Sequence, residues 1–320
     1  MRFAIVGAGA LGTILAAALE NAGHAVQVLA RGQRFAQIKT AGLNVEGVQN
    51  WRGACDAVDD PNQVGPADVI IFAVKSQDNE AAAQALAHLQ PRAVFSVANG
   101  VKKADELVAA FSQPAALGCM ADFSGELLGD GKVIFTRNVG LYLGHAANGA
   151  TAVVQELVEA LASAGLAARV SDEIETVEWS KFVGWVGLVA LSVISRLPTG
   201  RFLGDPDFAQ ILLQVIRETA QLAEKRSIRL ADQSPVPAAT IAYGNAKDAR
   251  NAVAQMAEQF HTQAPNHLMS SLQDFQKGKV LEHEATMGYA VRACRDAGLA
   301  APTLEVCYRL VCGLSRTHCT

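Results

Sequence analysis

Short continuous apolar runs alternate with helical stretches along the first third of the chain. The runs lack the apolar-polar alternation of a half-exposed strand, so they predict strands buried on both faces of a parallel sheet. These strands lie at residues 3–6, 25–29, 69–74 and 93–97, with helices predicted at residues 10–21 and 79–89. The alternation of strand and helix predicts a doubly wound α/β domain.

The pattern changes after about residue 115. Short strand candidates lie at residues 133–136, 141–143 and 167–170, and a helix is predicted at residues 152–164. We interpret these strands as an extension of the same sheet. A Rossmann-type, dinucleotide-binding domain is therefore expected over residues 1–171.

Beyond this point strand patterns almost vanish, and helical periodicity runs to the end of the chain. Breaks are expected at Pro198-Thr199-Gly200, Pro235-Val236-Pro237 and Ala301-Pro302. The longest uncharged apolar run, Phe182–Ser195, has 14 residues, fewer than the ~20 that cross a bilayer, and predicts a buried helix. We therefore predict an all-helical second domain over residues 172–320.

The composition is that of a globular protein with a weak net charge. Half of the 320 residues are hydrophobic, and 27 Lys and Arg residues against 31 Asp and Glu residues give a formal net charge of −4. This balance provides no basic surface for a nucleic acid or an anionic membrane, so neither partner is expected. The six cysteines form no Cys-x-x-Cys pair, which favours reduced thiols and a cytoplasmic protein.

A glycine-rich turn follows the first predicted strand and opens the first predicted helix. It reads Gly7-Ala8-Gly9-Ala10-Leu11-Gly12, the G-x-G-x-x-G pattern. The first glycine allows a tight turn, the second lets the backbone approach a pyrophosphate, and the third lets the helix pack closely on the strand. Phosphates would then sit at the helix N-terminus. We therefore predict a dinucleotide site and reject a secretion signal in this stretch.

The residues after the second predicted strand select the dinucleotide. NAD-binding proteins usually place Asp or Glu here to bond the ribose 2′-hydroxyl, whereas this chain has Leu29-Ala30-Arg31-Gly32-Gln33-Arg34. An arginine fork can hold a 2′-phosphate. Arg31, with Arg34 as a second candidate, therefore predicts NADP(H); an ordinary solvated arginine is the alternative.

Polar residues end two more predicted strands and begin the long apolar helix. Lys75 and Asn99 each follow a strand, at the carboxyl edge where open α/β sheets bind ligands. Lys181 lies within Glu178–Phe182, which is expected to open the apolar helix. A lysine at the start of a buried segment needs a carboxylate partner to stay charged, and Glu282 is the candidate.

Together these motifs resemble the ketopantoate reductase (2-dehydropantoate 2-reductase) family. The matches run in order along nearly the whole chain: the glycine motif, an arginine after the second strand, Val74-Lys75, Asn99-Gly100, Trp179-x-Lys181, and then Ser270, Gln273, Asp274, Gly278 and Glu282. The resemblance implies a Rossmann domain and an all-helical domain, with the active site in the cleft between them. It also implies reduction of a 2-oxo acid by NADPH, as in pantothenate biosynthesis.

The resemblance also implies roles for individual residues. Lys181 would be the general acid that protonates the carbonyl oxygen as NADPH delivers hydride. Glu282 and Ser270 would lie in the substrate site, and Asn99 would lie beside the nicotinamide and the substrate. Lys75 is expected at the cofactor.

One stretch departs from the family pattern. The family's lysine is typically followed by asparagine at the fourth and eighth positions, and both amides face the substrate because these positions share one helix face. Here those positions are Trp185 and Val189. Apolar bulk replaces two hydrogen-bonding groups, so we expect a 2-oxo acid with a more apolar tail than ketopantoate. Asn245 or Asn266 on a neighbouring helix could restore the lost bonds.

Other kinds of chemistry have weaker support. Cys307, Cys312, His318 and Cys319 lack the rigid spacing of a zinc site, so no metal is expected. The serine in Ser124-Gly125-Glu126 has no paired His and Asp for hydrolase chemistry.

Several candidate residues also have purely structural interpretations. Ser270 could be a helix N-cap, Trp185 a core residue, and Lys181 a helix lysine whose stem lies along the apolar surface. We interpret His283, which follows Glu282, as a solvated helix residue rather than a proton relay.

We therefore predict a cytoplasmic NADPH-dependent reductase that converts a small 2-oxo acid to its 2-hydroxy acid. Two alternatives stay open: a related opine-type or 3-hydroxyacid-type dehydrogenase, and a catalytically silent NADP(H)-binding protein. The sequence leaves the oligomeric state open, with a homodimer as one option.

Overall fold

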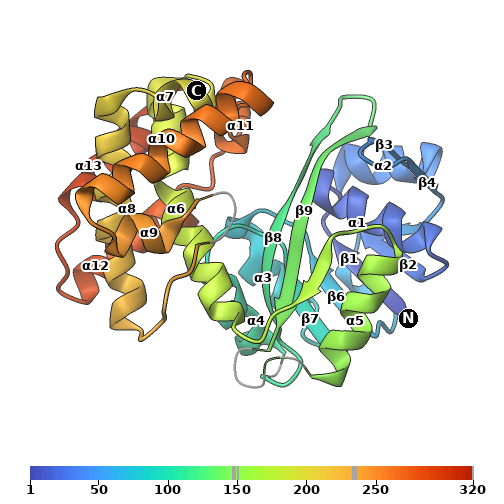
Figure 1. The fold of residues 1–320 in the computed structure, drawn as a ribbon. Coiled ribbons are helices and arrows are strands. Elements are labelled where there is room, and N and C mark those ends of the chain that lie inside the picture. The colour runs from blue at the N-terminus through green and yellow to red at the C-terminus, as the bar shows by residue number, and fades with distance from the viewer. Residues whose placement is uncertain (112, 146–148, 150, 233–235, 319–320) are drawn as a thin grey trace. The chain divides into compact units, whose positions relative to one another are not determined.

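The computed structural model describes residues 1–318 except 112, 146–148, 150 and 233–235 (Figure 1). The chain divides into two compact units, Met1–Glu175 and Thr176–Thr320. Every strand of the described residues lies in the first unit, and the second is built from helices. The predicted fold class, an α/β domain with a parallel sheet followed by a helical domain, is confirmed.

A five-stranded parallel sheet lies in the first unit. Its strands are β1 (Arg2–Val6), β2 (Ala25–Leu29), β5 (Asp56–Val58), β6 (Val69–Phe72) and β7 (Ala93–Ser96). They lie in the order β5-β2-β1-β6-β7, and every neighbouring pair is parallel. Numbered along the chain, this order is 3-2-1-4-5, which is the order of a Rossmann sheet.

Burial explains the continuous apolar runs of the four predicted strands. Ile5 of β1 pairs with Val28 on one side and Ile71 on the other, and all residues of β6 and β7 are buried. The fifth strand, β5, has three residues, of which Asp56 is exposed. That is too short a pattern to predict a strand.

Helices cover both faces of the parallel sheet. They are α1 (Ala10–Asn21), α2 (Gly32–Ala41), α3 (Asn79–Ala85), α4 (Lys103–Ala110) and α5 (Ala152–Ser163). α1 and α5 share one apolar core, and α3 and α4 share the core on the other face. Short 3₁₀ turns occupy Pro61–Gln63 and Ser76–Asp78.

The predicted extension of the parallel sheet is wrong, because a second sheet forms instead. Its strands are β3 (Leu43–Gly47), β4 (Trp51–Gly53), β8 (Gly118–Leu127), β9 (Val133–Gly144) and β10 (Ala168–Val170). The two short strands predicted within β9 are one long strand, which pairs antiparallel with β8 and parallel with β3 and β10. Register shifts in β8 after Asp122 and after Ser124 interrupt the apolar pattern.

The position of α1 explains its alanine-rich sequence. It contacts strands of both sheets, and every residue from Gly12 to Leu19 is buried. A helix that is apolar on all sides buries all sides. Small residues let the strands of both sheets approach this helix.

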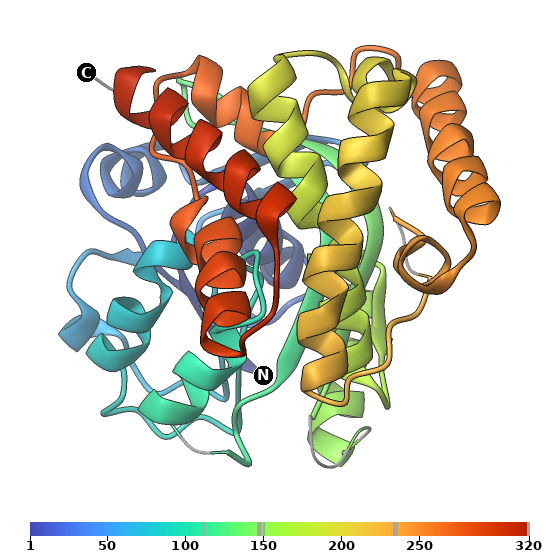
Figure 2. The ribbon, with the colours of Figure 1, turned by 90° about the vertical axis from the view of Figure 1, so that its left-hand side faces the viewer.

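The second unit consists of an apolar helix and amphipathic helices packed with it. They are α6 (Ile174–Ser195), α7 (Thr199–Leu203), α8 (Pro206–Lys225), α9 (Ala238–Tyr243), α10 (Ala246–Gln263), α11 (Ser270–Gln276), α12 (Tyr289–Asp296) and α13 (Pro302–His318). A π-helical turn, Glu284–Gly288, precedes α12. Figure 2 shows α8, in yellow, and the red α13, which pack against each other.

Proline residues mark the predicted breaks between these helices. α6 ends before Pro198, α9 begins after Pro237, and α13 begins at Pro302. Proline suits the start of a helix because its missing N–H would have no acceptor there. Pro235, in the second predicted break, lies outside the described residues.

The long apolar helix begins earlier than predicted. α6 starts at Ile174 rather than at Glu178, so Lys181 lies about two turns inside it. Among the described residues, α6 is the one helix that is long and apolar enough to cross a membrane, and 89% of its apolar window is buried within the structure. This burial matches the predicted core helix.

Candidate functional site

The turn between β1 and α1 contains the close contacts that require its glycines. Gly7 has a φ of +97° and donates its N–H to the Leu29 carbonyl at 2.9 Å. A Cβ at Gly12 would collide with the Gly7 carbonyl, whereas a Cβ at Gly9 would meet no atom within 4 Å. Gly9 therefore borders open space, which a side chain would partly fill.

The first turn of α1 offers hydrogen-bond donors to an anion. Its first intrahelical bond joins the Thr13 N–H to the Gly9 carbonyl at 3.0 Å, so the N–H groups of residues 10–12 have no acceptor within the helix. No acidic residue lies in this turn, and no side chain caps it. The open space, the donors and the positive end of the helix dipole fit a dinucleotide pyrophosphate.

The glycine turn lies where the strand order of the parallel sheet reverses. β1 and β6 are neighbours at this switch point, and the exposed Lys75 follows β6. The Ser76 hydroxyl donates to the Asn99 carbonyl at 2.8 Å, which joins the ends of β6 and β7. Lys75 and Asn99 therefore lie at the edge of the sheet where such folds bind ligands.

The two candidate arginines have different surroundings. Arg31 is exposed at the N-cap position of α2. The half-buried Arg34 donates to the Ala8 carbonyl at 2.8 Å and to the Thr13 hydroxyl at 2.9 Å. It also donates to the Gly131 carbonyl at 2.9 Å. These bonds engage Arg34 within the protein, so Arg31 alone is left as the candidate for a 2′-phosphate.

Four of the predicted substrate residues line one small cavity in the helical unit. Trp185 and Val189 contribute from α6, Ser270 from the first residue of α11, and Glu282 from the segment before the π-helical turn. The cavity volume is about 10 Å³, room for about one water molecule. Trp185 and Val189 are 8% and 4% exposed, so both belong to the core while also lining the cavity.

Lys181 lies on the same face of α6 as these two residues. It is half-buried, one turn before Trp185 and two turns before Val189. Residues at i, i+4 and i+8 follow one helix face. The structure therefore places the candidate acid in line with the cavity, and its pairing with Glu282 stays a prediction.

Serine hydroxyls join α6 to α11 beside the cavity. The Ser192 hydroxyl donates to the Val189 carbonyl at 2.9 Å and lies 3.2 Å from the Ser271 hydroxyl. Ser270 is the first residue of α11, and the N-cap position belongs to Met269. The interpretation of Ser270 as a helix N-cap is therefore wrong, and its side chain borders the cavity instead.

His283 differs from the predicted solvated residue. Its side chain is 12% exposed and lines the cavity next to Glu282. Burial holds the pKa of His283 below its usual value, against the opposing effect of the Glu284 carboxylate. The imidazole Nε2 lies 3.6 Å from Glu284 Oε1. A neutral imidazole beside the candidate site was not foreseen from the sequence.

One cluster has side chains of the types that bind metals. The ligand atoms of His283, Glu284 and Cys312 lie within 4.8 Å of one another. However, Tyr308 donates to Glu284 at 2.7 Å and Arg292 forms an ion pair with it at 3.1 Å. The carboxylate is therefore satisfied, and the Arg292 cation opposes a metal ion here. Cys319, of the cluster considered in the sequence, lies outside the described residues.

The asparagines that could replace the lost amides do not line the cavity. Asn245 is the N-cap of α10, where its side chain accepts from the N–H groups of Lys247 and Asp248 and donates to the Asp248 carboxylate. Asn266 is exposed. The cavity therefore keeps an apolar wall on the α6 side.

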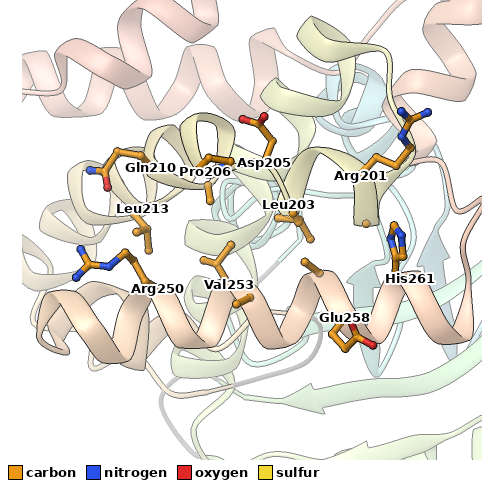
Figure 3. A pocket seen from close by; sticks show the side chains of 15 residues that line it. Arg201, Leu203, Asp205, Pro206, Gln210, Leu213, Arg250, Val253, Glu258 and His261 are labelled. Carbon is orange, nitrogen blue, oxygen red and sulfur yellow. The ribbon is translucent and has the colours of Figure 1, made fainter.

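A larger groove lies between α7, α8 and α10. Its volume is about 620 Å³, and it has apolar side chains such as Leu203, Leu213 and Val253 between polar ones (Figure 3). Figure 3 shows Arg250 toward one end and Arg201 toward the other. No predicted site residue lines this groove. Its residues are spread over separate helices, so no motif in the sequence predicts it.

Known protein families match both units of the chain. A model described as "Ketopantoate reductase PanE/ApbA" matches residues 3–148, and one described as "Ketopantoate reductase PanE/ApbA C terminal" matches residues 173–315. The chain belongs to the ketopantoate reductase PanE/ApbA family. The resemblance seen in the motifs is thereby confirmed, and this family member is an oxidoreductase.

Relatives align with this family member along nearly its whole length. The 2-dehydropantoate 2-reductase of Archaeoglobus fulgidus is 26% identical, covering 98% of this chain and 97% of its own. The uncharacterized oxidoreductase YkpB of Bacillus subtilis is 24% identical, covering 96% and 97%. Full-length alignment with both kinds of relative is consistent with the family and does not identify one substrate.

Solved structures share the same fold. A PanE/ApbA family ketopantoate reductase from Ralstonia eutropha superposes with a TM-score of 0.84 at 27% identity, covering 99% of both chains. A D-mandelate dehydrogenase in a ternary structure with NADH and anilino(oxo)acetate superposes with a TM-score of 0.87 at 20% identity, covering 100% of both chains. This second likeness shows the fold alone.

Proposed function

We propose that this chain is a cytoplasmic, NADPH-dependent reductase that converts a small 2-oxo acid to the 2-hydroxy acid. The observation that carries the proposal is the glycine turn at the switch point of the sheet, with the exposed Arg31 and no acidic residue after β2. Full-length relatives named 2-dehydropantoate 2-reductase support the substrate class. A homodimer stays a prediction.

The first unit offers the groups that would hold the cofactor. Bound NADPH would supply hydride to the substrate. The N–H groups at the start of α1 would bind its pyrophosphate, and the Arg31 guanidinium would bind its 2′-phosphate. Lys75, which follows β6, is assigned to the cofactor. Asn99, which follows β7, is assigned to the place where the nicotinamide meets the substrate. The absence of an acid after β2 favours NADPH over NADH.

Carbonyl reduction needs a proton as well as a hydride. We assign the proton to the Lys181 ammonium, which would transfer it to the carbonyl oxygen as hydride reaches the carbonyl carbon. Glu282 would favour the charged form of Lys181 before each turnover. The hydroxyl product leaves a neutral lysine, which then takes a proton from solvent.

Trp185 and Val189 support a substrate with an apolar tail. Both are buried and both line the cavity. Val189 has no hydrogen-bonding group in its side chain, and Trp185 offers only its indole N–H, which can donate but not accept. Ser270 and Asn99 stay as polar groups for the carboxylate and carbonyl end. The D-mandelate dehydrogenase of the same fold is named with anilino(oxo)acetate, an oxo acid that carries an aromatic ring. The fold is therefore compatible with such a ligand.

The proposal is tested by following NADPH oxidation by the purified chain with a panel of 2-oxo acids. We expect turnover with branched and aromatic tails and slower turnover with ketopantoate. NADPH binding without turnover on any oxo acid would instead favour the silent NADP(H)-binding protein. Oxidation of 3-hydroxy acids by NADP⁺, or NADPH oxidation that requires an amine together with the 2-oxo acid, would favour a dehydrogenase of the 3-hydroxyacid or opine type.

A further inference from the structure

Arg34 joins three segments that are far apart in the sequence. It lies in the first turn of α2, and its guanidinium reaches the Ala8 carbonyl at 2.8 Å in the glycine turn. It also reaches the Thr13 hydroxyl at 2.9 Å in α1 and the Gly131 carbonyl at 2.9 Å between β8 and β9. Each contact uses a different nitrogen of the guanidinium. The side chain therefore fixes the glycine turn against two neighbouring segments.

The Ala8 carbonyl accepts a second bond, from the Thr13 hydroxyl at 3.2 Å. In a planar trans peptide the carbonyl and the N–H of the next residue point in opposite directions. Holding the Ala8 carbonyl toward Arg34 therefore turns the Gly9 N–H away from Arg34. Within the described part of the chain no acceptor takes this N–H, and a Cβ on Gly9 would meet open space.

A peptide between glycines rotates easily unless something holds it. Gly7 and Gly9 can adopt many backbone conformations, and this freedom costs entropy when an anion orders the turn. A turn that is already held loses less entropy when the ligand binds. The Arg34 bonds supply this restraint from outside the turn.

We propose that Arg34 is a positioning residue that presets the Ala8–Gly9 peptide for the cofactor pyrophosphate, an inference that rests on the proposed NADPH-binding function. Arg31 and Arg34, one helical turn apart, then have different roles in cofactor binding. Arg31 recognises the 2′-phosphate directly, whereas Arg34 acts on the pyrophosphate through the backbone.

Gln37 provides a matched control. It lies one turn after Arg34 on α2 and donates to the Gly129 carbonyl at 2.9 Å, in the same turn between β8 and β9. It makes no contact with the glycine turn among the bonds of the described residues. The Gln37 Oε1 also accepts a long bond from Arg34 Nη1 at 3.4 Å. Gln37→Ala therefore removes a tie to the β8–β9 turn and this long bond, and leaves in place the Arg34 Nε bond to the Ala8 carbonyl.

The test measures dissociation constants for three probes: NADPH, ADP-ribose, which has the pyrophosphate without the 2′-phosphate, and 2′-AMP, which has the 2′-phosphate without the pyrophosphate. Arg34→Ala should weaken NADPH and ADP-ribose by about tenfold or more, the scale of a lost bond to a charged donor, and change 2′-AMP less than about twofold. Arg31→Ala should weaken NADPH and 2′-AMP and leave ADP-ribose nearly unchanged, and Gln37→Ala should change none of the three.

Steady-state kinetics provides a second readout. Arg34→Ala should raise the KM for NADPH and keep kcat at saturating NADPH within about twofold, because the proton donor is untouched. Arg34→Lys should recover part of the ADP-ribose affinity, since one ammonium can still donate to the Ala8 carbonyl. If Arg34→Ala does not fold, the same measurements are made on Arg34→Lys, in which the affinity for ADP-ribose should fall more than the affinity for 2′-AMP.

The proposal is wrong if Arg34→Ala weakens ADP-ribose and 2′-AMP equally, or weakens neither. Its failure is distinct from failure of the proposed function. A wild-type chain that binds ADP-ribose but does not prefer NADPH would contradict the NADPH assignment, while the Arg34 comparison still proceeds with ADP-ribose. A wild-type chain that binds neither NADPH nor ADP-ribose would contradict both the proposed function and the role of Arg34.

Discussion

The Gly7 carbonyl oxygen lies so close to Gly12 that no side chain fits between them. This contact sets the distance between the end of β1 and the first turn of α1. Gly9 lies between these two residues in the sequence, yet a Cβ there would meet nothing within 4 Å. The same motif thus holds one glycine required by packing within the protein and one whose space is left for a ligand.

These two glycines should respond differently to alanine. Gly12→Ala forces the Gly7 carbonyl to move, so we expect loss of about 1–3 kcal/mol in the free energy of unfolding, as for other overpacked sites, together with weak NADPH binding. Gly9→Ala should change the unfolding free energy by less than about 1 kcal/mol and still weaken NADPH by tenfold or more. Denaturant unfolding and fluorescence titration measure the two effects. Equal destabilisation by both variants would contradict this division.

Arg31 should set the preference for the phosphorylated cofactor. The side chain is exposed at the start of α2, and no acid follows β2. We expect NADPH to bind at least tenfold more tightly than NADH, about 1.4 kcal/mol, and Arg31→Ala to remove most of this gap. Arg52→Ala, which removes another exposed arginine of the same unit, is the control for net charge. Equal wild-type dissociation constants for the two cofactors would show that the preference does not exist.

Local apolar runs were enough to predict α1 and four of the five strands of the parallel sheet, because β1, β6 and β7 are largely buried and their signal does not depend on distant partners. The second sheet could not be predicted in this way. β9 pairs with β3, β8 and β10 across long stretches of chain, and register shifts interrupt the apolar pattern of β8. One signal was present: Asp130-Gly131 is a dipeptide typical of a hairpin, and it lies between β8 and β9.

The part of the candidate site that could be predicted is the part whose residues belong to the ordered sequence motifs. Trp185, Val189, Ser270 and Glu282 were selected by comparison with the motifs of the family that the sequence resembles, and the structure brings all four to one cavity. The engagement of Arg34 was not predictable, since its bond to Gly131 spans 97 positions. The burial of His283 was also missed, because a histidine before a π-helical turn carries no sequence signal for burial.

Loss of Lys181 should affect the chemical step. If this residue donates the proton, Lys181→Ala should lower kcat by ~10² or more, the usual scale of general acid catalysis, and leave the dissociation constant for NADPH nearly unchanged. Glu282→Gln should also lower kcat, because it removes the charge assigned to hold Lys181. Single-turnover rates and cofactor titration separate the two quantities. A Lys181→Ala variant within threefold of wild type would assign the proton to another group.

Burial of His283 should make stability depend on pH. Its pKa is held below the usual histidine value of 6.5, chiefly by burial and also by Arg316, while Glu284 opposes this effect. Below pH 6.5 the unfolded chain therefore takes up this proton before the folded one does, and the free energy of unfolding falls as the pH drops toward the folded pKa. His283→Gln should flatten this slope, measured by urea unfolding between about pH 7 and 5. The exposed His88→Gln should leave it as in wild type, and an unchanged slope in His283→Gln would contradict the assignment.

Trp185 and Val189 should decide the substrate tail. Each unpaired buried polar group costs roughly 1–3 kcal/mol, so the hydroxyl of ketopantoate should be disfavoured beside an apolar wall. We expect kcat/KM for 2-oxo acids with unhydroxylated branched or aromatic tails to exceed that for ketopantoate by about tenfold or more. Val189→Asn restores one amide with a small change in volume and should narrow this ratio. Val189→Leu, which stays apolar, is its control.

Trp185→Asn tests the other position, but it also removes a large buried ring and should destabilise the fold by about 3 kcal/mol or more. Its effect is therefore read as the ratio of kcat/KM values for two substrates on the same preparation, because the fraction of folded protein cancels in that ratio. The ratio should move toward ketopantoate in Trp185→Asn and further in the double variant with Val189→Asn. A wild-type chain that already prefers ketopantoate clearly would show that these two apolar residues do not exclude its hydroxyl.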